Sequence, residues 1–434
     1  MQNKPLSEAS AAAGPLAGYR VIELGSTVAG PFCARLMADF GAEVIKVEQL
    51  EGDAVRSMGN QKDGRSLYGA SILRNKHNVS IDLRQQQGRD IVARLIRSAD
   101  IVIENFRPGT LEKWGMGYDE LVKTNPGLVL VRISGYGQDG PYSRRPGYGV
   151  VCEAISGIRE VTGDPDRPPA RVAVSMTDYI TGLYAAFGAV MAVLDRQRSG
   201  RGQVIDAALY ESAFSFMEPH IPAFQQLGLV ATRCGSRLPG HTPNTLYTTA
   251  DQRYIHITAG SQSIFKRLAE AMGRPDLLDD PRYATPTARA AHDDETDALV
   301  QDWTGSKTLA EIEQLLDAAN VPASRIFDMR DIFDDPHYAA RDMIVTAQDA
   351  QLGPVAMANV VPRLSGNPGG VRWAGRDTGA DTRSVLAAAL DMDEAEIAAL
   401  SAAGIVYQAD DAHGGGARHR GDQGITPTPA SRPD

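Results

Sequence analysis

The chain has 434 residues, of which 43% are hydrophobic, and it carries a formal net charge of −10 at pH 7. A chain of this length and apolar content can bury a large core, and we expect two domains. The acidic balance argues against a surface for nucleic acid, because no basic run lies among aromatic residues. The three cysteines, Cys33, Cys152 and Cys234, have neither disulfide nor metal-ligand spacing and indicate a reducing compartment.

The amino-terminal residues show no targeting signal. Residues 1–16 lack both the basic segment and the apolar core of a signal peptide. The longest apolar stretch, residues 183–194, is too short to span a bilayer and contains the small residues of a core helix. We therefore expect a soluble, cytoplasmic protein with no membrane partner, in which residues 1–17 form a flexible tail.

The first half of the chain predicts alternating strands and helices. A strand over residues 20–24 leads into a small-residue loop at 25–30 and a helix over 31–40, which Pro31 begins and Gly41 ends. Further strands are expected at 43–48, 78–83, 101–103 and 128–133, with helices at 88–98 and 118–123. This βαβ rhythm predicts an α/β fold with a parallel sheet that helices cover on both faces.

A long helix is expected in the middle of the chain, after a short strand. Residues 171–174 have the character of a strand, and residues 183–194 are almost entirely apolar, so we expect the helix that contains them to be buried. Asp178 lies where this helix begins. A carboxylate in that place is either a helix cap or a reactive group in a dry pocket, and taken alone the cap is the simpler interpretation.

From about residue 235 the chain becomes richer in helices. A strand is expected at 254–258 and helices at 263–272, 286–303 and 308–320, with Thr285 as the cap of the second helix. These elements predict a smaller domain over residues 231–340. Residues 341–408 are expected to rejoin a large domain that begins with residues 18–230. Residues 409–434, rich in Gly, Arg, His and Pro, are expected to be disordered.

The loop after the first strand raises the alternative of a dinucleotide enzyme. Gly25 and Gly30 open a helix, and Glu48 follows where an acid could bind a ribose. The spacing of the glycines is wrong, however, and Val28 stands where close approach to a pyrophosphate needs glycine. A plain βα turn is therefore as good an interpretation as a nucleotide site. The histidines have no spacing that predicts a metal site.

Several basic side chains lie near the ends of predicted elements, among them Arg84 and Lys113. Arg107, in the turn after residues 101–103, would face the crevice where open parallel sheets bind ligands. Arg144 and Arg145, with Tyr148, could receive phosphates and stack a base. Each of these residues, taken singly, could equally belong to a solvated loop.

Together and in this order, the motifs of the chain resemble those of the class III CoA-transferase family, which includes formyl-CoA transferase, carnitine CoA-transferase and α-methylacyl-CoA racemase. The motifs are Gly30-Pro31, Gly41–Glu48, Asn75-Lys76, Glu104–Gly109, Ser134–Gly137, Arg145–Tyr148, Asp178 and Gly200–Val204. The resemblance extends from about Gly18 to Val406. It implies a Rossmann-like large domain with a parallel sheet built from both chain ends, a smaller α+β domain, and an interlinked, ring-like homodimer.

The resemblance also assigns site residues. It makes Asp178 the catalytic aspartate and places Val28 and Ala29 in the active-site loop. It assigns contacts with coenzyme A to Ile81, Asp82, Leu83, Arg84, Asn105, Phe106, Arg107, Lys113, Arg145 and Tyr148. It implies acyl-CoA and carboxylic acids as substrates, with no tightly bound cofactor and no metal. Two positions depart from the family: Val28 replaces the glutamine of formyl-CoA transferase, and Gln49 stands where a basic residue often follows the second strand.

An aspartate suits acyl transfer. A carboxylate that attacks an acyl-CoA thioester forms a mixed anhydride, and the freed thiolate can then attack the aspartyl carbonyl. The apolar helix after Asp178 would exclude water, and its amino end would keep Asp178 ionised. Backbone N–H groups of residues 28–30 or 259–261 could stabilise the oxyanions.

Two other functions are weighed against a transferase. The racemase branch resembles Gly-His-Asp where this chain has Gly147-Tyr148-Gly149. A phenol, with an ordinary pKa of about 10, is poorly suited to proton exchange at neutral pH. The missing histidine favours a transferase. A CoA-binding protein without turnover is the third interpretation, and the context of Asp178 argues against it.

The substrates are predicted more coarsely. Residues 153–159 and 207–211 resemble members of the family that act on dicarboxylates, which makes succinyl-CoA a candidate donor. Arg159, Arg171 or Arg237 could receive the distal carboxylate, because a guanidinium pairs with it through two hydrogen bonds. Each of the three could equally be a surface arginine.

Overall fold

The computed structural model describes residues 14–409. The tails predicted for residues 1–17 and 409–434 therefore lie almost wholly outside the described residues. Residues 14–17 form a turn, in which the Leu16 N–H donates to the Phe40 carbonyl over 3.0 Å.

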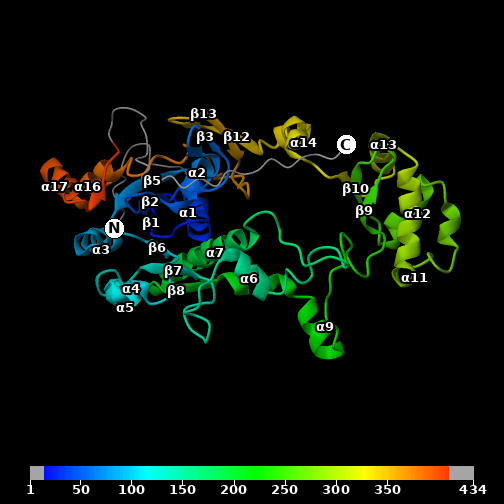
Figure 1. Ribbon diagram of the computed structural model, residues 1–434, viewed down its shortest axis with the longest axis horizontal. Coiled ribbons are helices and arrows are strands. Elements are labelled where there is room, and N and C mark those ends of the chain that lie inside the picture. Colours follow the sequence, from blue (N-terminus) through cyan, green and yellow to red (C-terminus); the bar gives the residue numbers. More distant parts are fainter. Residues whose placement is uncertain (1–13, 410–434) are drawn as a thin grey trace.

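A seven-stranded sheet forms the core of the larger part of the molecule, in the order β14-β5-β2-β1-β6-β7-β8 (Figure 1). Its strands are β1 (Arg20–Glu23), β2 (Glu43–Glu48), β5 (Lys76–Ile81), β6 (Ile101–Glu104), β7 (Val129–Ser134), β8 (Val204–Ala208) and β14 (Val406–Tyr407). All neighbouring pairs are parallel except β14, which runs antiparallel to β5. The predicted parallel-dominated α/β sheet is confirmed, and both halves of the chain contribute to it.

Helices cover both faces of this sheet because successive strand residues point to opposite sides. On one side, Ile22, Val102 and Leu130 pack with α3 (Gln86–Arg97), α5 (Tyr118–Thr124), α16 (Thr382–Leu390) and α17 (Glu394–Ala402). On the other side, Val21 and Val129 pack with α1 (Ala29–Asp39) and α7 (Met176–Ser199). The expected two-sided cover is present.

The direction of winding reverses between β1 and β6. After β1 the chain passes through α1 to β2 on one side, whereas after β6 it passes through α4 (Thr110–Lys113) and α5 to β7 on the other. In open α/β sheets such a reversal leaves a crevice at the carboxyl ends of the two strands, and ligands bind there. The loops after β1 and β6 therefore define the first place to look for a site.

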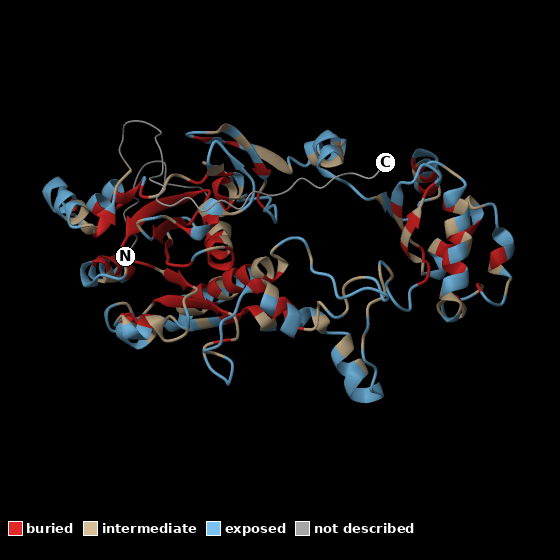
Figure 2. Ribbon diagram, viewed as in Figure 1, coloured by how far each residue is buried: buried red, intermediate tan, exposed pale blue. Residues whose placement is uncertain are grey.

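The long helix differs from the prediction. Residues 171–174 form no strand and are largely exposed; the place beside β7 belongs to β8 instead. Small residues such as Gly182, Ala185 and Ala189 bury one face of α7 against α1 and the sheet, whereas Leu183 and Phe187 are more than half exposed. Figure 2 colours both buried and less buried residues along this helix. The expectation of a fully buried helix is wrong, because only the small-residue face reaches the core.

Helix α7 is also longer than the apolar stretch that was expected to be too short for a bilayer. With 24 residues, it is the one described helix that could cross a membrane by length and composition. Its small-residue face packs on the sheet, as in the core helix of a globular domain.

A second, three-stranded antiparallel sheet lies at the far end of the molecule, at the right of Figure 1. It consists of β9 (Asn244–Thr248), β10 (Tyr254–Thr258) and β11 (Ala323–Arg325), with α10 (Gln262–Ala271), α12 (Asp293–Gly305) and α13 (Leu309–Ala318) packed on it. Thr285 caps α11 (Pro286–Ala291) as predicted. The single helix expected over 286–303 is instead two helices, because the backbone leaves helical geometry at His292. The boundaries of the smaller domain stay a prediction.

The remaining elements connect these layers. They are η2 (Ala54–Ser57), β3 (Gln61–Lys62), β4 (Arg65–Ser66), α2 (Leu67–Ile72), α6 (Gly149–Ile155), α8 (Leu209–Phe214), η3 (Ser215–Met217), α9 (His220–Leu227), η4 (Pro275–Leu278), α14 (Met329–Asp334), α15 (Pro336–Ala340), β12 (Ile344–Asp349) and β13 (Gly353–Ala358). Buried Arg74 ties the returning segment to the first half of the chain: it pairs with Asp39 in α1 and donates to the carbonyl of Ala358 in β13.

Candidate functional site

At the point where the winding reverses, the side-chain amide of Asn105 joins the loops after β1 and β6. The Asn105 side chain, directly after β6, accepts from the Ser26 N–H (2.9 Å) and donates to the Ser26 carbonyl (2.8 Å) in the loop after β1. Gly25 lets the loop after β1 fold closely against the start of α1, since a Cβ there would lie 3.1 Å from the Gly30 Cα. The two loops therefore form one surface, which leads directly into the amino end of α1.

Asp178 lies beside this surface, in the first turn of α7. The N-cap of the helix is Ser175, so Asp178 does not cap it, contrary to the simpler interpretation of the sequence. One turn further, Gly182 brings α7 against α1: a Cβ at Gly182 would lie 2.8 Å from the carbonyl oxygen of Ala29. Val28 packs in a cluster with Tyr179, the neighbour of Asp178. The predicted loop residues Val28 and Ala29 thus do lie near Asp178.

The Asp178 carboxylate rests on backbone at the start of α6. A Cβ at Gly149 would lie 2.1 Å from Asp178 Oδ2, so only glycine leaves room for the carboxylate in its present place. Gly149 follows Tyr148, whose side chain is 59% exposed. The hydroxyls of Tyr68 and Tyr179 lie 2.8 Å apart, and Asp178 adds to the effects that raise the Tyr68 pKa, of which burial is the largest.

Burial governs the charge of Asp178. It raises the pKa of this carboxyl group to about 6, since a half-buried carboxylate loses part of its hydration. Burial therefore works against the amino end of the helix, which was expected to keep Asp178 ionised. The group is still mostly ionised at neutral pH, and its weak hydration leaves it a more basic nucleophile than an exposed aspartate.

Four buried charges lie beneath the loop after β1. Lys46 Nζ donates to the Gly25 carbonyl and pairs with Asp53 (2.7 Å) and Glu23 (3.1 Å). Lys76 Nζ reaches Glu23 and the Pro31 carbonyl, at 2.7 Å each. All four side chains are nearly inaccessible to solvent. Burial alone would lower the pKa of Lys46, but Asp53 and Glu23 raise it on balance.

The residues predicted to contact coenzyme A lie at the same sheet edge but not in one cluster. Ile81 ends β5, two strands from β1 and so about 10 Å away, and Asp82, Leu83 and Arg84 follow it. Arg84 Nε donates a hydrogen bond to the Asp82 carboxylate over 2.8 Å. This ion pair partly neutralises the charge that was predicted to meet a phosphate.

The predicted residues after β6 and β7 are more open. Phe106 packs on Trp114, with ring centroids 5.2 Å apart, and its N–H is fixed by Glu104. In the described part of the chain, the exposed side chains of Arg107 and Lys113 have no hydrogen-bond or ion-pair partner. Arg145 lies 3.8 Å above the ring of Tyr142.

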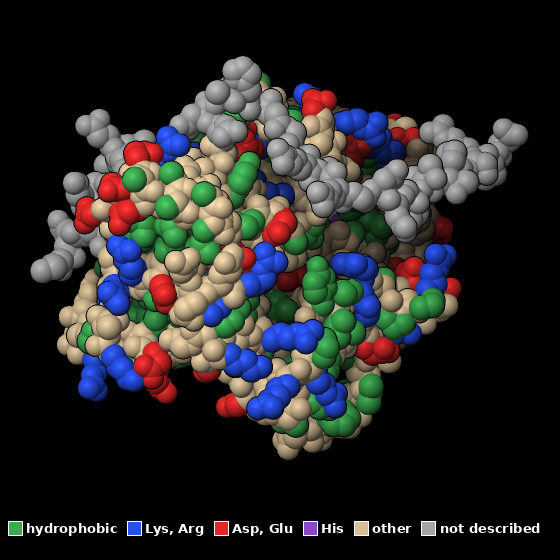
Figure 3. Space-filling view, turned by 60° about the vertical axis from the view of Figure 1, so that its left-hand side comes forward, with side chains coloured by type: hydrophobic (Ala, Val, Ile, Leu, Met, Phe, Trp, Pro, Cys, Tyr) green, Lys and Arg blue, Asp and Glu red, His purple; other side chains and the backbone are tan. Residues whose placement is uncertain are grey.

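Basic side chains also gather locally on the molecular surface. In the space-filling view, Lys and Arg side chains concentrate beside hydrophobic ones on the lower part of the face shown (Figure 3). A chain with a net charge of −10 can therefore still present a positive area to an anionic ligand.

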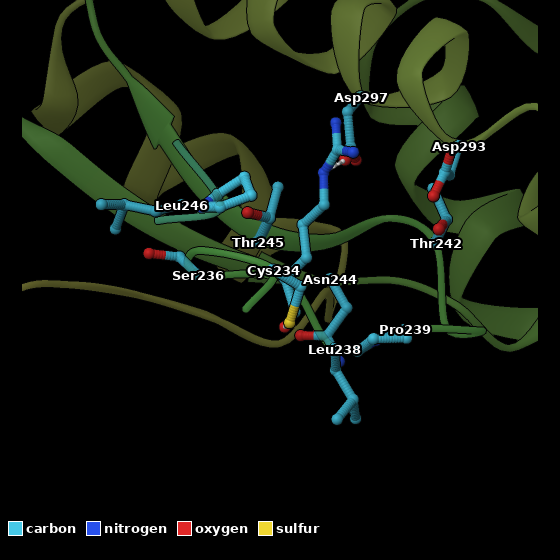
Figure 4. A pocket seen from close by; sticks show the side chains of 12 residues that line it. Cys234, Ser236, Leu238, Pro239, Thr242, Asn244, Thr245, Leu246, Asp293 and Asp297 are labelled. Atoms are coloured by element: carbon cyan, nitrogen blue, oxygen red, sulfur yellow. Dashed lines mark hydrogen bonds and ion pairs between the residues drawn. The ribbon is translucent and has the colours of Figure 1, made fainter. Parts of the chain in front are cut away.

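Two of the three arginines proposed for a distal carboxylate form ion pairs within the chain. Arg237 pairs with Asp294 (2.6 Å) and Asp297 (2.8 Å). It lines a cavity of about 470 Å³ between β9 and α12, with Cys234, Asn244 and Asp293 among its neighbours (Figure 4). Arg159 pairs with Glu153 (3.2 Å). Arg171 is exposed on the connection before α7.

Of the two loops proposed to hold an oxyanion, the structure favours residues 28–30. The N–H of Ala259 already donates to the Pro243 carbonyl over 2.7 Å, in the second sheet. The amino end of α1 has no side-chain cap. Among the described residues, no group of three or more His, Cys, Asp and Glu side chains is placed to hold a metal ion.

No role in this site was predicted for Lys46, Asp53, Tyr68, Lys76 or Tyr179, although Lys46 and Lys76 lie in motifs that carry the family resemblance. A further signal was present for Lys46, which interrupts the apolar residues Val44, Ile45 and Val47 of β2.

Comparisons with known proteins find relatives of this chain over most of its length. Residues 16–382 match the model of CoA-transferase family III. The chain is 46% identical to succinyl-CoA–D-citramalate CoA-transferase of Chloroflexus aurantiacus, covering 90% of this chain and 98% of that protein. It is 40% identical to the beta subunit of succinyl-CoA–L-malate CoA-transferase of the same organism, covering 88% and 96%. The crystal structure of a CAIB/BAIF family protein from Brucella suis superposes with a TM-score of 0.78 at 32% identity, over 87% of this chain and 100% of that one.

Proposed function

The chain belongs to CoA-transferase family III, and on that basis we propose that it moves coenzyme A between an acyl-CoA thioester and a free dicarboxylate through Asp178. The observation that carries this proposal is the position of Asp178. Its half-buried carboxylate, with a pKa raised to about 6, rests on the backbone of Gly149 beside the ligand-binding edge of the sheet. A carboxylate so placed is mostly ionised at pH 7 and only weakly solvated.

Asp178 Oδ attacks the thioester carbonyl carbon, and the C–S bond breaks to give a mixed anhydride and the CoA thiolate. The thiolate then attacks the Asp178 Cγ, which forms an aspartyl-CoA thioester and releases the donor carboxylate. The acceptor carboxylate attacks the same Cγ and expels the thiolate. The thiolate finally attacks the acceptor's acyl carbon, which yields the new acyl-CoA and restores Asp178.

The uncapped amino end of α1 supports the charge that develops in these steps. Backbone N–H groups at Val28 and Ala29 are the donors we assign to the oxyanions, because α1 lies against α7 one turn from Asp178. The residues that end β5 and β6, together with Arg145 and Tyr148, line the path that we assign to coenzyme A.

We propose succinyl-CoA as donor and a C4–C5 dicarboxylate of the malate or citramalate type as acceptor. The names of the relatives in Chloroflexus aurantiacus support this assignment. A panel of acyl-CoA donors against mono- and dicarboxylic acids tests it. Turnover with monocarboxylates alone would contradict it.

Trapping of the aspartyl intermediate tests the mechanism. Incubation with succinyl-CoA and hydroxylamine should convert Asp178 to a hydroxamate, which peptide mass spectrometry locates, and should inactivate the enzyme in parallel. The Asp178→Asn variant should resist this modification. An inactivated enzyme that carries no modification at Asp178 would rule out the covalent route.

Heavy water separates this activity from a racemase. A transferase leaves the α-hydrogen of the acyl group in place, whereas a racemase exchanges it without any acceptor acid. Acceptor-independent deuterium uptake would therefore overturn the proposal. Binding of CoA without any turnover would favour a non-catalytic binding protein.

We also propose that two copies of the chain form an interlocked homodimer. Helices α7 to α9 expose a series of large apolar side chains to solvent: Leu183, Tyr184, Phe187, Met191, Leu194, Phe214, Phe216, Ile221, Phe224 and Leu227. Exposed apolar surface of this extent indicates contact with another protein. The two extended connections between the larger and smaller parts of the molecule (Figure 1) would let a partner pass between them.

A further inference from the structure

The loop after β1 holds a backbone conformation that its own residues do not favour. Thr27 has φ +72°, in the left-handed region. A β-branched residue is an outlier there, because its Cβ crowds the following carbonyl oxygen. Such a conformation persists only where surrounding contacts impose it, and it is concentrated at functional sites.

Asp53 provides the contact that imposes it. Asp53 Oδ1 accepts from the Thr27 N–H over 3.0 Å and from the Val55 N–H over 2.8 Å. Its other oxygen pairs with Lys46, which also donates to the carbonyl of Gly25. The Asp53 carboxylate thus bonds the residue after Ser26, and the Lys46 ammonium group bonds the residue before it. Asn105 bonds the backbone of Ser26 itself.

This arrangement directs the next residues. Thr27 leads into Val28 and Ala29, the uncapped amino end of α1, which lies against α7 one turn from Asp178. If Thr27 relaxed to a negative φ, the backbone N–H groups at this end of α1 would turn away from the space beside Asp178.

We infer that Asp53 and Lys46 are positioning residues for CoA transfer: by fixing Thr27 in the left-handed conformation they aim the amino end of α1 at the reacting carbonyl group. This inference rests on the proposed function for its kinetic consequence. The two residues act on the reaction through the loop backbone that they bond, at Thr27 and Gly25.

The kinetic test uses succinyl-CoA with malate or citramalate. Asp53→Ala should lower kcat at least about tenfold while the KM for succinyl-CoA changes less than about threefold, since a misplacement of about 1 Å can cost up to about 100-fold in rate. Adding Thr27→Gly to Asp53→Ala should recover several-fold of kcat, because glycine adopts a positive φ at no steric cost. Thr27→Gly alone should stay near the wild-type rate.

Asp349→Ala is the matched control. Asp349 is equally buried, pairs with Arg65 over 2.7 Å and accepts two backbone N–H groups, from Gln351 and Leu352, but it lies in β12 and touches no part of the loop. It should lose stability without the fall in kcat. Equal losses of kcat in the two variants would overturn the inference, and so would a wild-type kcat in Asp53→Ala.

If Asp53→Ala does not fold, a comparison of Thr27→Pro with Thr27→Gly tests the inference instead. Thr27→Pro fixes φ near −65° and removes the N–H that Asp53 accepts, at a residue near the surface. It should lose at least tenfold in kcat where Thr27→Gly does not. A Thr27→Pro variant that is as active as Thr27→Gly would contradict the inference.

Hydrogen exchange gives a readout that needs no turnover. In Asp53→Ala, the peptide covering residues 25–30 should exchange faster than in the wild type or in Asp349→Ala. Unchanged exchange would overturn the inference even in an inactive enzyme. By contrast, a wild type with no transferase activity, or an active Asp178→Asn variant, would refute the proposed function and leave the exchange result intact.

Discussion

Asp178 combines two properties that usually exclude each other, partial burial and charge at neutral pH. Burial raises its pKa to about 6, so the proposed nucleophile is protonated just below the physiological range. We predict that kcat/KM stays level above pH 7 and falls through an apparent pKa near 6 toward acid, up to about tenfold per unit. A pH–rate profile measured with one acyl-CoA pair checks this. A profile that stays flat to pH 5 would contradict the assigned nucleophile.

The same burial predicts a cost in stability. A carboxyl group whose folded pKa lies above its unfolded value destabilises the fold at high pH, and this cost disappears as the pH falls from 6 toward 4. Asp178→Asn should therefore raise the free energy of unfolding at pH 8 by about 1–2 kcal/mol, after a discount for the solvent that still reaches the group.

Urea unfolding at pH 8 and pH 5 measures this difference. The advantage of Asp178→Asn should shrink at the lower pH while the variant stays inactive at both. A destabilised variant at pH 8 would show instead that the carboxylate makes contacts that the fold requires.

At the scale of elements, the junction of α6 and α7 is set by one glycine. Gly149→Ala would place a Cβ 2.1 Å from Asp178 Oδ2, so the carboxylate must move. We predict a fall in kcat of about 100-fold, since displacement of a reacting group by about 1 Å costs this order of rate.

Gly305→Ala in α12 is the control for Gly149→Ala. Only Gln301 Nε2 approaches the added Cβ there, at 3.5 Å. The control should keep full activity, and a normal rate in Gly149→Ala would show that Asp178 can react from another position.

The elements that the sequence predicts well are those whose burial is visible in local composition. The segment 101–103 is a short apolar run, the segment 43–48 alternates apolar with charged residues, and both form strands at those positions. Residues 171–174 have the same β-branched character, yet they form no strand, because β8 occupies the sheet position beside β7. Local pattern does not reveal such competition between distant segments.

The candidate site likewise contains residues that local motifs predict and residues that they do not. Asn105 was expected to contact coenzyme A, and in the structure it bonds the backbone of Ser26. The nearness of Asp178 and Val28 could be predicted from their motifs. The support beneath the loop could not, because it depends on register: Glu23 and Lys46 are direct partners across β1 and β2, and Lys76 comes from the next strand. These residues are far apart in the sequence, and only the pairing of the strands places their charges side by side.

At the scale of the whole molecule, Arg74 joins parts of the chain that lie almost 300 positions apart. It is fully buried, bonds Asp39 through two nitrogens and donates to the Ala358 carbonyl. Arg74→Met would leave Asp39 charged and buried without this partner, so we predict a loss of about 3–5 kcal/mol. Urea denaturation measures it, with the exposed Arg94→Met in α3 as a control that should stay within about 0.5 kcal/mol of the wild type.

The proposed homodimer is also a property of the whole molecule. Phe187 is 59% exposed in the monomer, so Phe187→Glu should not disturb the fold of one chain but should place a charge inside the interface. We predict a shift from dimer to monomer in light scattering, whereas Tyr254→Glu, in the second sheet, should leave the dimer intact. A wild type that is monomeric at micromolar concentration would refute the proposal.

The return of the chain to its first sheet has a consequence for synthesis. β14, at residues 406–407, supplies the antiparallel partner of Ser80 and Ile81, and Asp381 accepts from the Asn78 N–H. A nascent chain leaves the ribosome from its amino end. The backbone N–H and C=O groups at the outer edge of β5 therefore have no strand partner until more than 300 further residues have been translated. Whatever shields that edge during this interval, the native sheet is completed only as translation nears its end.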